Sequence, residues 1–139
     1  MPHYSSNILP EGAFFDIIVF PPVSVFNKHL QEKTQCPSTR LRALIDTGAS
    51  LSCINDDVAK TLNLVARDKQ MVGNAGGGSE QFLYDVGFHL PIPNTHILPL
   101  QVFGVNLKNQ PYQALIGRDV LKFCNFIYSG ASSFWTLSI

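Results

Sequence analysis

The chain has 139 residues, of which 45% are hydrophobic and 14% are charged, and its formal net charge at pH 7 is zero. This length predicts one domain with a core of its own, and the low content of charge argues against a disordered chain. A neutral chain without a basic patch favours neither nucleic acid nor an anionic membrane as a partner.

The three cysteines, Cys36, Cys53 and Cys124, are scattered along the chain. An odd number without Cys-x-x-Cys spacing fits neither a disulfide framework nor a zinc site, so we expect free thiols, no metal and no other cofactor. The sequence shows no signal-peptide pattern and no apolar run of membrane-spanning length. A cytoplasmic location is therefore the expectation.

The sequence pattern of the first 45 residues predicts an arm, a strand, a helix and a second strand, in that order. Residues 1–12 are polar and contain two prolines, so we expect a flexible arm. A run of Phe, Ile and Val over 13–20 predicts a buried strand that stops at a pair of prolines. A rough helical stripe follows over 22–33, on which His29 fits a half-buried packing residue better than a ligand. A loop over 34–40 and a strand over 41–45 come next.

The stretch 43–50 reads Ala-Leu-Ile-Asp-Thr-Gly-Ala-Ser. Three apolar residues bring the carboxylate of Asp46 to the end of a strand, where it is costly to desolvate unless donors or a second carboxylate compensate. Gly48 lets the backbone turn sharply and approach other groups closely. From these residues alone two interpretations remain, a strand that ends in a polar turn and a catalytic aspartate held in a tight loop.

A second short strand is predicted over 51–54, and a helix follows it. Asn55 is placed to cap this helix, whose first residues are Asp56 and Asp57. Acidic residues are favourable at the positive end of a helix dipole. We therefore interpret the two aspartates as part of the helix start and not as catalytic acids.

Residues 70–81 hold four glycines between apolar flanks. The segment lacks the Gly-Lys-Ser/Thr ending and the following helix of a phosphate-binding loop, so nucleotide binding is disfavoured. Strict alternation over 82–90 predicts that the glycines lead into a strand. A glycine-rich tip between strands predicts a hairpin, which is either a plain surface turn or a flap that closes over a cleft.

The remaining residues predict short strands and one short helix. A proline-rich connection over 91–99 precedes a strand over 100–105, and residues 114–121 predict a strand, a tight turn and a helix. A terminal hairpin ends in an aromatic strand that carries Phe134, Trp135, Leu137 and Ile139, for which a place in the core and a place in a dimer interface remain open. Together the pattern predicts an all-β, barrel-like domain with two or three short helices.

Three motifs occur in the order and spacing of a retropepsin-like aspartic protease. They are Ala-Leu-Ile-Asp-Thr-Gly-Ala at 43–49, Met-Val-Gly at 71–73 leading into the glycine-rich hairpin, and Leu-Ile-Gly-Arg-Asp-Val-Leu at 115–121. From residue 13 to residue 139 the sequence resembles the bacterial, gag-polyprotein-type members of that family. The resemblance implies one domain over 13–139, folded as a closed acid-protease-like barrel with one lobe per chain.

The resemblance also implies roles for individual residues. Asp46 matches the catalytic aspartate, Thr47 the residue whose hydroxyl bonds across to the partner loop, and Gly48 the glycine of the same turn. Arg118 matches an arginine with a structural role at the start of a helix. The substrate-binding positions that the resemblance implies, in the catalytic loop, the flap and the pocket beside them, are Ala49, Ser50, Gly73, Asn74, Ala75, Gly76 and Leu115.

The sequence departs from the retroviral pattern in two places. Ser50 occupies the position at which retroviral enzymes carry an aspartate. That aspartate binds the substrate backbone and pairs with the arginine that Arg118 matches. Arg118 is therefore expected to pair with Asp119 or Asp57 instead. The stretch 21–40 is longer than the compact retroviral loop, and the sequence assigns no role to it.

Peptide hydrolysis by this chemistry needs two carboxylates about a hydrogen bond apart that share one proton. The chain contains a single Asp-Thr-Gly, so the second carboxylate must come from a symmetric copy. The first hypothesis is a homodimeric aspartic endopeptidase with Asp46 from each subunit, acting on a peptide or protein. The alternative keeps the fold without the chemistry, as a catalytically weak or inactive dimeric peptide-binding or scaffolding domain.

Overall fold

The computed structural model describes residues 2–74 and 77–139. Its helices and strands, in chain order, are β1 (His3–Asn7), β2 (Phe14–Phe20), α1 (Val23–Glu32), β3 (Thr39–Ile45), β4 (Cys53–Asn55), α2 (Asp56–Thr61), β5 (Asp68–Asn74), β6 (Gly77–His89), β7 (Leu98–Val105), β8 (Ala114–Ile116), α3 (Arg118–Leu121), β9 (Asn125–Ser129) and β10 (Phe134–Ser138). No helix among the described residues is both long enough and apolar enough to span a membrane.

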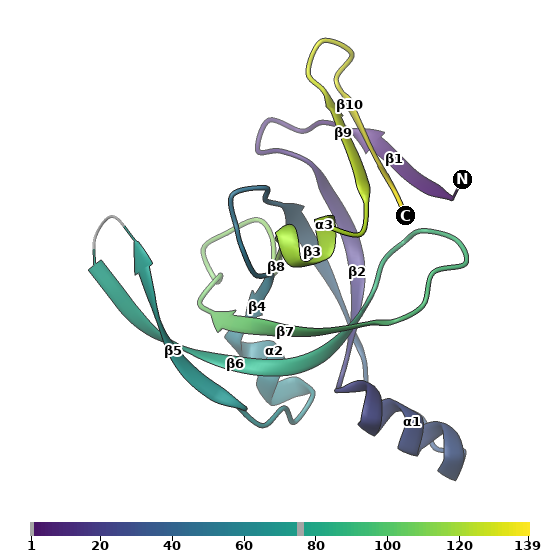
Figure 1. Ribbon diagram of the computed structural model, residues 1–139, viewed down its shortest axis with the longest axis vertical. Coiled ribbons are helices and arrows are strands. Elements are labelled where there is room, and N and C mark those ends of the chain that lie inside the picture. The colour runs from purple at the N-terminus through teal and green to yellow at the C-terminus, as the bar shows by residue number, and fades with distance from the viewer. Residues whose placement is uncertain (1, 75–76) are drawn as a thin grey trace.

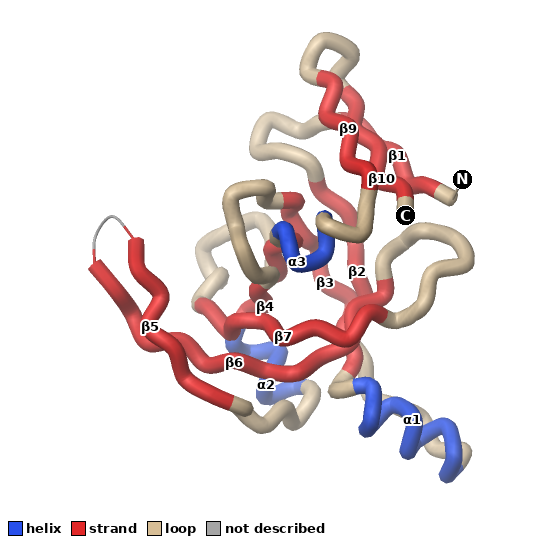
Figure 2. Tube along the Cα trace, in the orientation of Figure 1, coloured by secondary structure: helices blue, strands red, loops and turns tan. Residues whose placement is uncertain are grey.

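Six of the described strands close into a barrel (Figures 1 and 2). They follow one another in the order β2-β3-β8-β4-β7-β6, and β6 also pairs with β2. Closure removes the free edges that an open sheet would present to other chains. β5 pairs with the outer part of β6, so that these two strands continue beyond the barrel as a hairpin. The prediction of an all-β barrel with two or three short helices is confirmed.

Two identical Ala-Leu-Ile triplets lie side by side in this barrel. β3 and β8 run parallel, with Ala43 opposite Ala114 and Ile45 opposite Ile116. All four of these side chains are buried in the core, because alternate residues of a strand face the same side. This register brings the ends of the two strands together, and with them the two motifs that follow.

The residues of β10 divide between the core and the surface. Trp135 and Leu137 are fully buried in the core, whereas Phe134 is 40% exposed. Ile139, which follows the strand, is half-buried against the core. The two alternatives for the aromatic terminal strand therefore apply to different residues, since Trp135 and Leu137 are core and Phe134 is available to a partner.

β1 forms a three-stranded sheet with β10 and β9, in the order β1-β10-β9 (Figure 1). The expectation of a flexible arm over 1–12 is wrong for the residues of β1, from His3 opposite Ser138 to Asn7 opposite Phe134. Tyr4 fixes this strand, because its ring centroid lies 5.4 Å from that of Trp135. A polar pentapeptide gains strand structure from such contacts and not from its own propensity.

Helix α1 occupies the insertion at 21–40 and projects from the barrel (Figure 2). It has no buried residue, and it contacts the barrel through the rings of Phe26 and Phe20, whose centroids lie 5.3 Å apart. His29 is half-buried, as predicted, and its Nδ1 lies 2.7 Å from the hydroxyl oxygen of Thr34. His29 therefore helps to close the C-terminal end of the helix.

Asn55 occupies the N-cap position of α2, as predicted, but its side chain does not bond to the helix backbone. Its Oδ1 accepts a hydrogen bond from the backbone N–H of Leu107 at 2.9 Å. Its Nδ2 donates to Oδ1 of Asp57 at 2.7 Å. Asp57 is therefore engaged in the structure of the helix start, which agrees with the structural interpretation of the two aspartates.

Candidate active site

The chain turns at Asp46, directly after β3. The backbone N–H of Asp46 donates to the carbonyl of Ile116 at 2.9 Å, which continues the pairing of β3 with β8 by one residue. Its carbonyl accepts a hydrogen bond from the N–H of Ala49 at 3.2 Å, and its carboxylate Oδ1 accepts one from the N–H of Gly48 at 2.9 Å. An aspartate that bonds to the N–H two residues later forms a local turn of its own. These contacts fix both the backbone and one carboxylate oxygen of Asp46.

The outer side of this loop faces solvent in the single chain. Asp46 and Ala49 are half-buried, and Thr47, Gly48 and Ser50 are exposed. Within the described residues the Thr47 hydroxyl has no hydrogen-bond partner. A carboxylate and a hydroxyl are thus available at the surface to a second molecule.

The turn after β8 holds this loop from the side. A Cβ on Gly117 would lie 2.9 Å from the carbonyl oxygen of Ala49 and 2.9 Å from the carbonyl carbon of Leu51, so a larger residue there would displace backbone. The next N–H, that of Arg118, donates to the same Ala49 carbonyl at 2.8 Å. The two loops therefore interlock through their backbones, and the glycine is needed for their close approach.

A buried polar network lies beneath the two loops. The Oγ of Ser52, a residue with no exposed surface, accepts a hydrogen bond from the N–H of Gly117 at 2.9 Å and donates to Oδ1 of Asp119 at 2.7 Å. Asp119 also accepts from the backbone N–H of Ser52 at 3.0 Å and from that of Val120 at 2.9 Å. Fully bonded buried networks of this kind make a local structure rigid. Sequence reasoning missed this network, whose one sequence signal is a hydroxyl residue inside an apolar strand.

Arg118 binds the loop that carries Asp46, but not in the predicted way. Its Nη1 donates to the carbonyl of Thr47 at 2.9 Å. The ion pairs among the described residues include neither Asp119 nor Asp57 with this arginine. The predicted pairing is wrong because Asp119 turns inward to Ser52 and Asp57 bonds to Asn55. The arginine thus supports the Asp46 loop by bonding to the loop's backbone.

Cys53 lies under the loop and is buried. The pKa of the Cys53 thiol is raised to about 12, mainly by burial and to a smaller extent by the negative charges of Asp46 and Asp119. The thiol is therefore neutral at physiological pH and adds no charge beneath the carboxylate of Asp46.

The glycine-rich segment forms the predicted hairpin. β5 and β6 pair antiparallel from Asp68 opposite Leu83 to Asn74 opposite Gly77, and Figure 1 shows them as a curved arm beyond the barrel. Two ion pairs connect its strands near the base, Arg67 with Asp85 at 3.0 Å and Lys69 with Glu80 at 3.6 Å. Of the predicted flap residues, Gly73 and Asn74 end β5. The other two, Ala75 and Gly76, lie outside the described residues.

A pocket of about 470 Å³ opens beside Asp46. Its walls come from the end of β3, from the turn at 11–13 and from β9, which contributes Phe126 and Tyr128. Asp46 and Thr47 line it, whereas the predicted substrate-binding residues Ala49, Ser50 and Leu115 do not. Leu115 is half-buried, opposite Leu44 and Cys53 in the sheet. The structure thus places the first two residues of the Asp-Thr-Gly motif next to the terminal sheet, a connection that the sequence did not predict.

No group of three or more His, Cys, Asp and Glu residues in the described part of the chain is arranged to hold a metal ion. The charged group at the centre of the candidate site is the carboxylate of Asp46. A carboxylate in such a position can act as an acid or a base, and the exposed residue Thr47 lies next to it in the chain.

Comparison with known proteins agrees with this geometry. The family model described as "gag-polyprotein putative aspartyl protease" matches residues 34–123. The crystal structure of a retropepsin-like aspartic protease from Rickettsia conorii is similar, with 13% identity, a TM-score of 0.60 and coverage of 97% of this chain and 89% of that one. The protease of EIAV in complex with the inhibitor HBY-793 is 18% identical with a TM-score of 0.55, over 85% of this chain and 92% of that one. None of the curated proteins matches the sequence.

The matched segment covers more than half of the chain and contains both interlocked loops, Asp46–Ser50 and the turn at Gly117. The solved structures, at these low identities, show the fold. The chain therefore belongs to the gag-polyprotein aspartyl protease family and has the retropepsin-like barrel that is also found in a bacterial relative.

Proposed function

We propose that the protein is an aspartic endopeptidase whose active site forms between two copies of the chain, with Asp46 contributed by each. The observation that carries the proposal is the Asp46 loop itself, a surface carboxylate on a backbone that is bonded to Ile116 and Arg118. Precise positioning of this kind serves catalysis, because the reacting groups need not be organised during the reaction.

The proposed reaction uses the two carboxylates in different protonation states. The ionised Asp46 takes a proton from a water molecule, whose oxygen attacks the carbonyl carbon of the scissile peptide bond. The protonated Asp46 of the second copy donates its proton to the carbonyl oxygen. Two carboxylates this close hold one proton between them, so activity should be greatest at mildly acidic pH.

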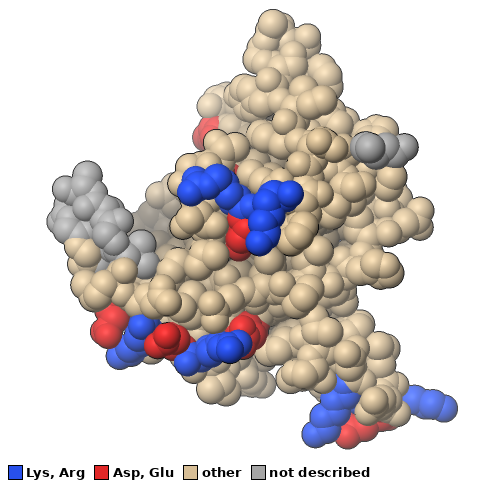
Figure 3. Space-filling model, viewed as in Figure 1, with Lys and Arg blue, Asp and Glu red and all other residues tan. Residues whose placement is uncertain are grey.

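The terminal sheet supplies the proposed surface for the second copy. β9 pairs with β10 on one side and with no described strand on the other, and it exposes 58% of Ile127 and 54% of Tyr128. The opposite edge, β1, carries mainly polar residues. In Figure 3 the region around the terminal sheet shows almost no charged side chains. An exposed apolar edge strand is a template for pairing with another chain.

This surface adjoins the catalytic loop. Phe126 and Tyr128 of β9 line the same pocket as Asp46, so a second copy that pairs through β9 would approach the carboxylate directly. Symmetric pairing of β9 strands uses one patch on both copies, as a two-fold dimer requires. Phe134 of β10, also exposed, extends the apolar surface toward the hairpin turn.

We also propose that the hairpin of β5 and β6 acts as the flap over a bound peptide. In this proposal the substrate lies between the flap, including residues 73–76, and the loop that contains Ala49 and Ser50, with Leu115 beside them. The described cysteines are free, which supports work in a reducing compartment such as the cytoplasm.

The alternative function is peptide binding without cleavage. The observation that favours it is the exposed Ser50, a neutral residue where an acidic group would hold the substrate backbone more firmly. A peptide-binding domain needs the cleft and the dimer but not the Asp46 carboxylate, so replacement of that group distinguishes the two functions.

The test is cleavage of an unbiased peptide library by the purified protein, with and without pepstatin. We expect pepstatin-sensitive cleavage by the wild type and none by Asp46→Asn, which keeps the shape of the side chain and removes its charge. Asp56→Asn is the matched control, because Asp56 is an exposed aspartate at the start of α2, and it should cleave like the wild type. Cleavage that survives in Asp46→Asn would refute the enzymatic proposal, and peptide binding without cleavage by the wild type would support the alternative.

A further inference from the structure

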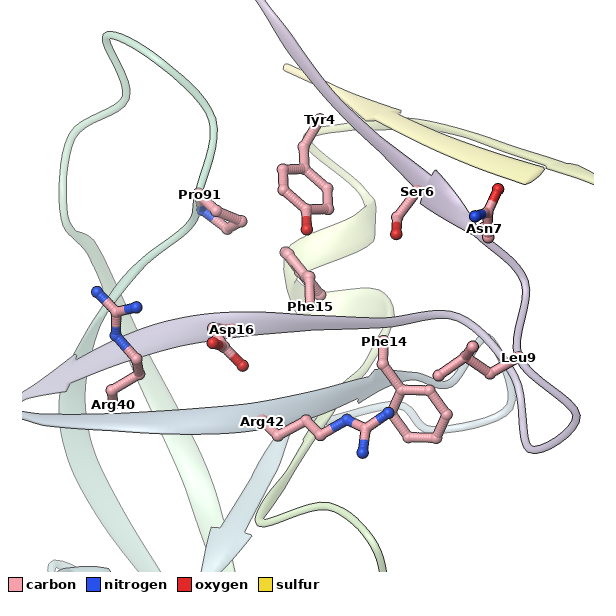
Figure 4. Close-up of a pocket in the computed structure, with 10 residues that line it drawn as sticks. All are labelled: Tyr4, Ser6, Asn7, Leu9, Phe14, Phe15, Asp16, Arg40, Arg42 and Pro91. Atoms are coloured by element: carbon pink, nitrogen blue, oxygen red, sulfur yellow. The ribbon is translucent and has the colours of Figure 1, made fainter.

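A recess of about 480 Å³ lies on the outer face of β2 and β3 (Figure 4). Its floor is formed by Phe14 and Asp16 of β2 with Arg40 and Arg42 of β3, and β1 forms one wall. It shares no lining residue with the pocket beside Asp46. The proposed catalytic function leaves this recess without a role.

No residue that the structure describes forms an ion pair with either arginine of the recess. Arg40 and Arg42 lie two positions apart on β3, so both side chains project to the same face of the sheet, which is the outer one. The half-buried Arg42 stacks on Phe14, with its guanidinium carbon 4.3 Å from the ring centroid. Within residues 2–74 and 77–139, neither guanidinium forms a hydrogen bond or an ion pair. Their donors are therefore free to bind an external acceptor.

The recess continues as a groove along β2. A second hollow of about 240 Å³ shares Asp16, Arg40 and Pro91 with the first and adds Ile18 and His89. Ile18 and His89 are directly paired across β2 and β6. Because Arg42 pairs with Asp16 and Arg40 with Ile18 in the sheet, the groove runs from Arg42 past Arg40 and across β2 to His89.

The charges in the groove favour a ligand with a single negative charge. Asp16, opposite Arg42 in the sheet, is the one acid that lines the groove, and Figure 4 shows its carboxylate between the two arginines. Two arginines and one aspartate leave one positive charge uncompensated. A single carboxylate balances that charge, whereas the second negative charge of a phosphate dianion would find no cation left to balance it, and a nucleic acid would find too few cations.

We propose that this groove binds an extended segment of a partner protein and places one of its acidic side chains on Arg40 and Arg42. The half-buried aromatic ring of Tyr4 offers contact area for an apolar residue two positions from the acidic one, on the same face of the extended segment. In Figure 4 the Tyr4 hydroxyl points into the recess, where it can bond to the segment's backbone. This binding is independent of catalysis.

Fluorescence anisotropy with a labelled peptide tests the proposal. The probe is the fluorescein-labelled nonapeptide Thr-Ala-Leu-Ser-Glu-Ser-Leu-Ala-Thr, and its partners carry Gln or phosphoserine in place of the central Glu. All measurements use the Asp46→Asn background, so that no peptide is consumed and the outcome does not depend on the proposed proteolysis. We expect the Gln peptide to bind about tenfold more weakly than the Glu peptide, since a hydrogen bond between charged groups is lost. The phosphoserine peptide should bind no more tightly than the Glu peptide, since its second negative charge has no cation left to balance it.

Three arginine variants locate the binding. Arg40→Gln and Arg42→Gln should each weaken binding of the Glu peptide about tenfold. Arg67→Gln is the matched control, because that exposed arginine is paired with Asp85 at the base of the hairpin, and its affinity should stay within about twofold of the wild type. Thermal melting checks that each variant is folded. If loss of the stacking on Phe14 unfolds Arg42→Gln, the affinity of Arg40→Gln alone tests whether the peptide binds at the arginines. Equal binding of the Glu and Gln peptides, tighter binding of the phosphoserine peptide, or wild-type affinity in Arg40→Gln would overturn the proposal.

Discussion

β3 and β8 carry the same apolar triplet in parallel register, yet the chain leaves the two strands in different ways. After β3 it forms a loop in which Thr47 and Gly48 are exposed and the Asp46 carboxylate reaches the surface. After β8 it forms a turn in which Gly117 is buried and Asp119 is bonded to Ser52. The same strand sequence thus leads into two different connections. The loop after β3 presents a carboxylate at the surface, and the turn after β8 holds that loop in place.

The difference shows how a surface carboxylate can be held precisely. The Asp46 loop is exposed on the side where a substrate or second copy would bind. The contacts that make it rigid must therefore lie on its opposite side. That rigidity comes from the turn at Gly117, through the carbonyl group of Ile116, the backbone N–H of Arg118 that donates to Ala49, and the guanidinium of Arg118. Changes in the supporting turn should therefore cost stability, whereas changes in the exposed loop should cost activity with little loss of stability.

The largest expected difference in stability is between two glycines. In Gly117→Ala the new methyl group meets backbone atoms of Ala49 and Leu51 at 2.9 Å, so the free energy of unfolding should fall by about 3 kcal/mol. In Gly48→Ala the nearest atom, Oδ1 of Asp46 at 3.2 Å, belongs to a side chain, and the loss should be about 1 kcal/mol or less. Urea unfolding measures both values, and equal losses would contradict the division into a supporting turn and an exposed loop.

Two serines provide the next comparison. Ser52→Ala leaves the buried N–H of Gly117 without its acceptor and removes a donor to Asp119, so we expect a loss of about 2 kcal/mol in urea unfolding. Ser50→Ala changes an exposed side chain and should alter stability by less than about 0.5 kcal/mol. A loss in Ser50→Ala as large as that in Ser52→Ala would show that the exposed loop also carries stability.

The buried thiol of Cys53 should make the free energy of unfolding depend on pH, and its raised pKa gives the sign of that dependence. Because the folded pKa of Cys53 is about 12 and its ordinary value is 9.0, the folded state holds the proton after the unfolded state has lost it. Stability should therefore fall as the pH rises from about 9 toward 12, by about 1 kcal/mol at pH 10. Urea unfolding of the wild type and Cys53→Ala at pH 8 and pH 10 isolates this contribution. The same pH dependence in both proteins would contradict it.

A small effect on stability is also expected for the Arg118 guanidinium, which contacts the Asp46 loop from outside. Arg118→Gln loses an exposed hydrogen bond to the Thr47 carbonyl, which should lower the free energy of unfolding by less than about 1 kcal/mol. Because this bond orients the loop, cleavage should decline more than stability does. Lys122→Gln, just beyond α3, is the control and should leave both unchanged. Unchanged cleavage in Arg118→Gln would show that this arginine does not help to orient the loop.

Sequence reasoning succeeded where local patterns determine the structure. The apolar triplets, the glycine-rich hairpin and the helix start at Asn55 each follow from neighbouring residues. It failed for β1, whose strand structure depends on Trp135 near the other end of the chain. It failed for Arg118 because the inward orientation of Asp119 depends on Ser52, 67 residues away. Contacts over such separations leave no pattern in the sequence on either side.

The central claim is that two copies of Asp46 form one active site, and a subunit-mixing experiment tests it most directly. A fixed amount of wild-type protein is mixed with increasing amounts of Asp46→Asn protein, and the rate of peptide cleavage is measured after subunit exchange. Each mixed dimer contains one carboxylate and one amide, so the account predicts that cleavage falls toward zero as the variant reaches excess. A rate that stays proportional to the wild-type protein, whatever amount of variant is present, would contradict the shared site.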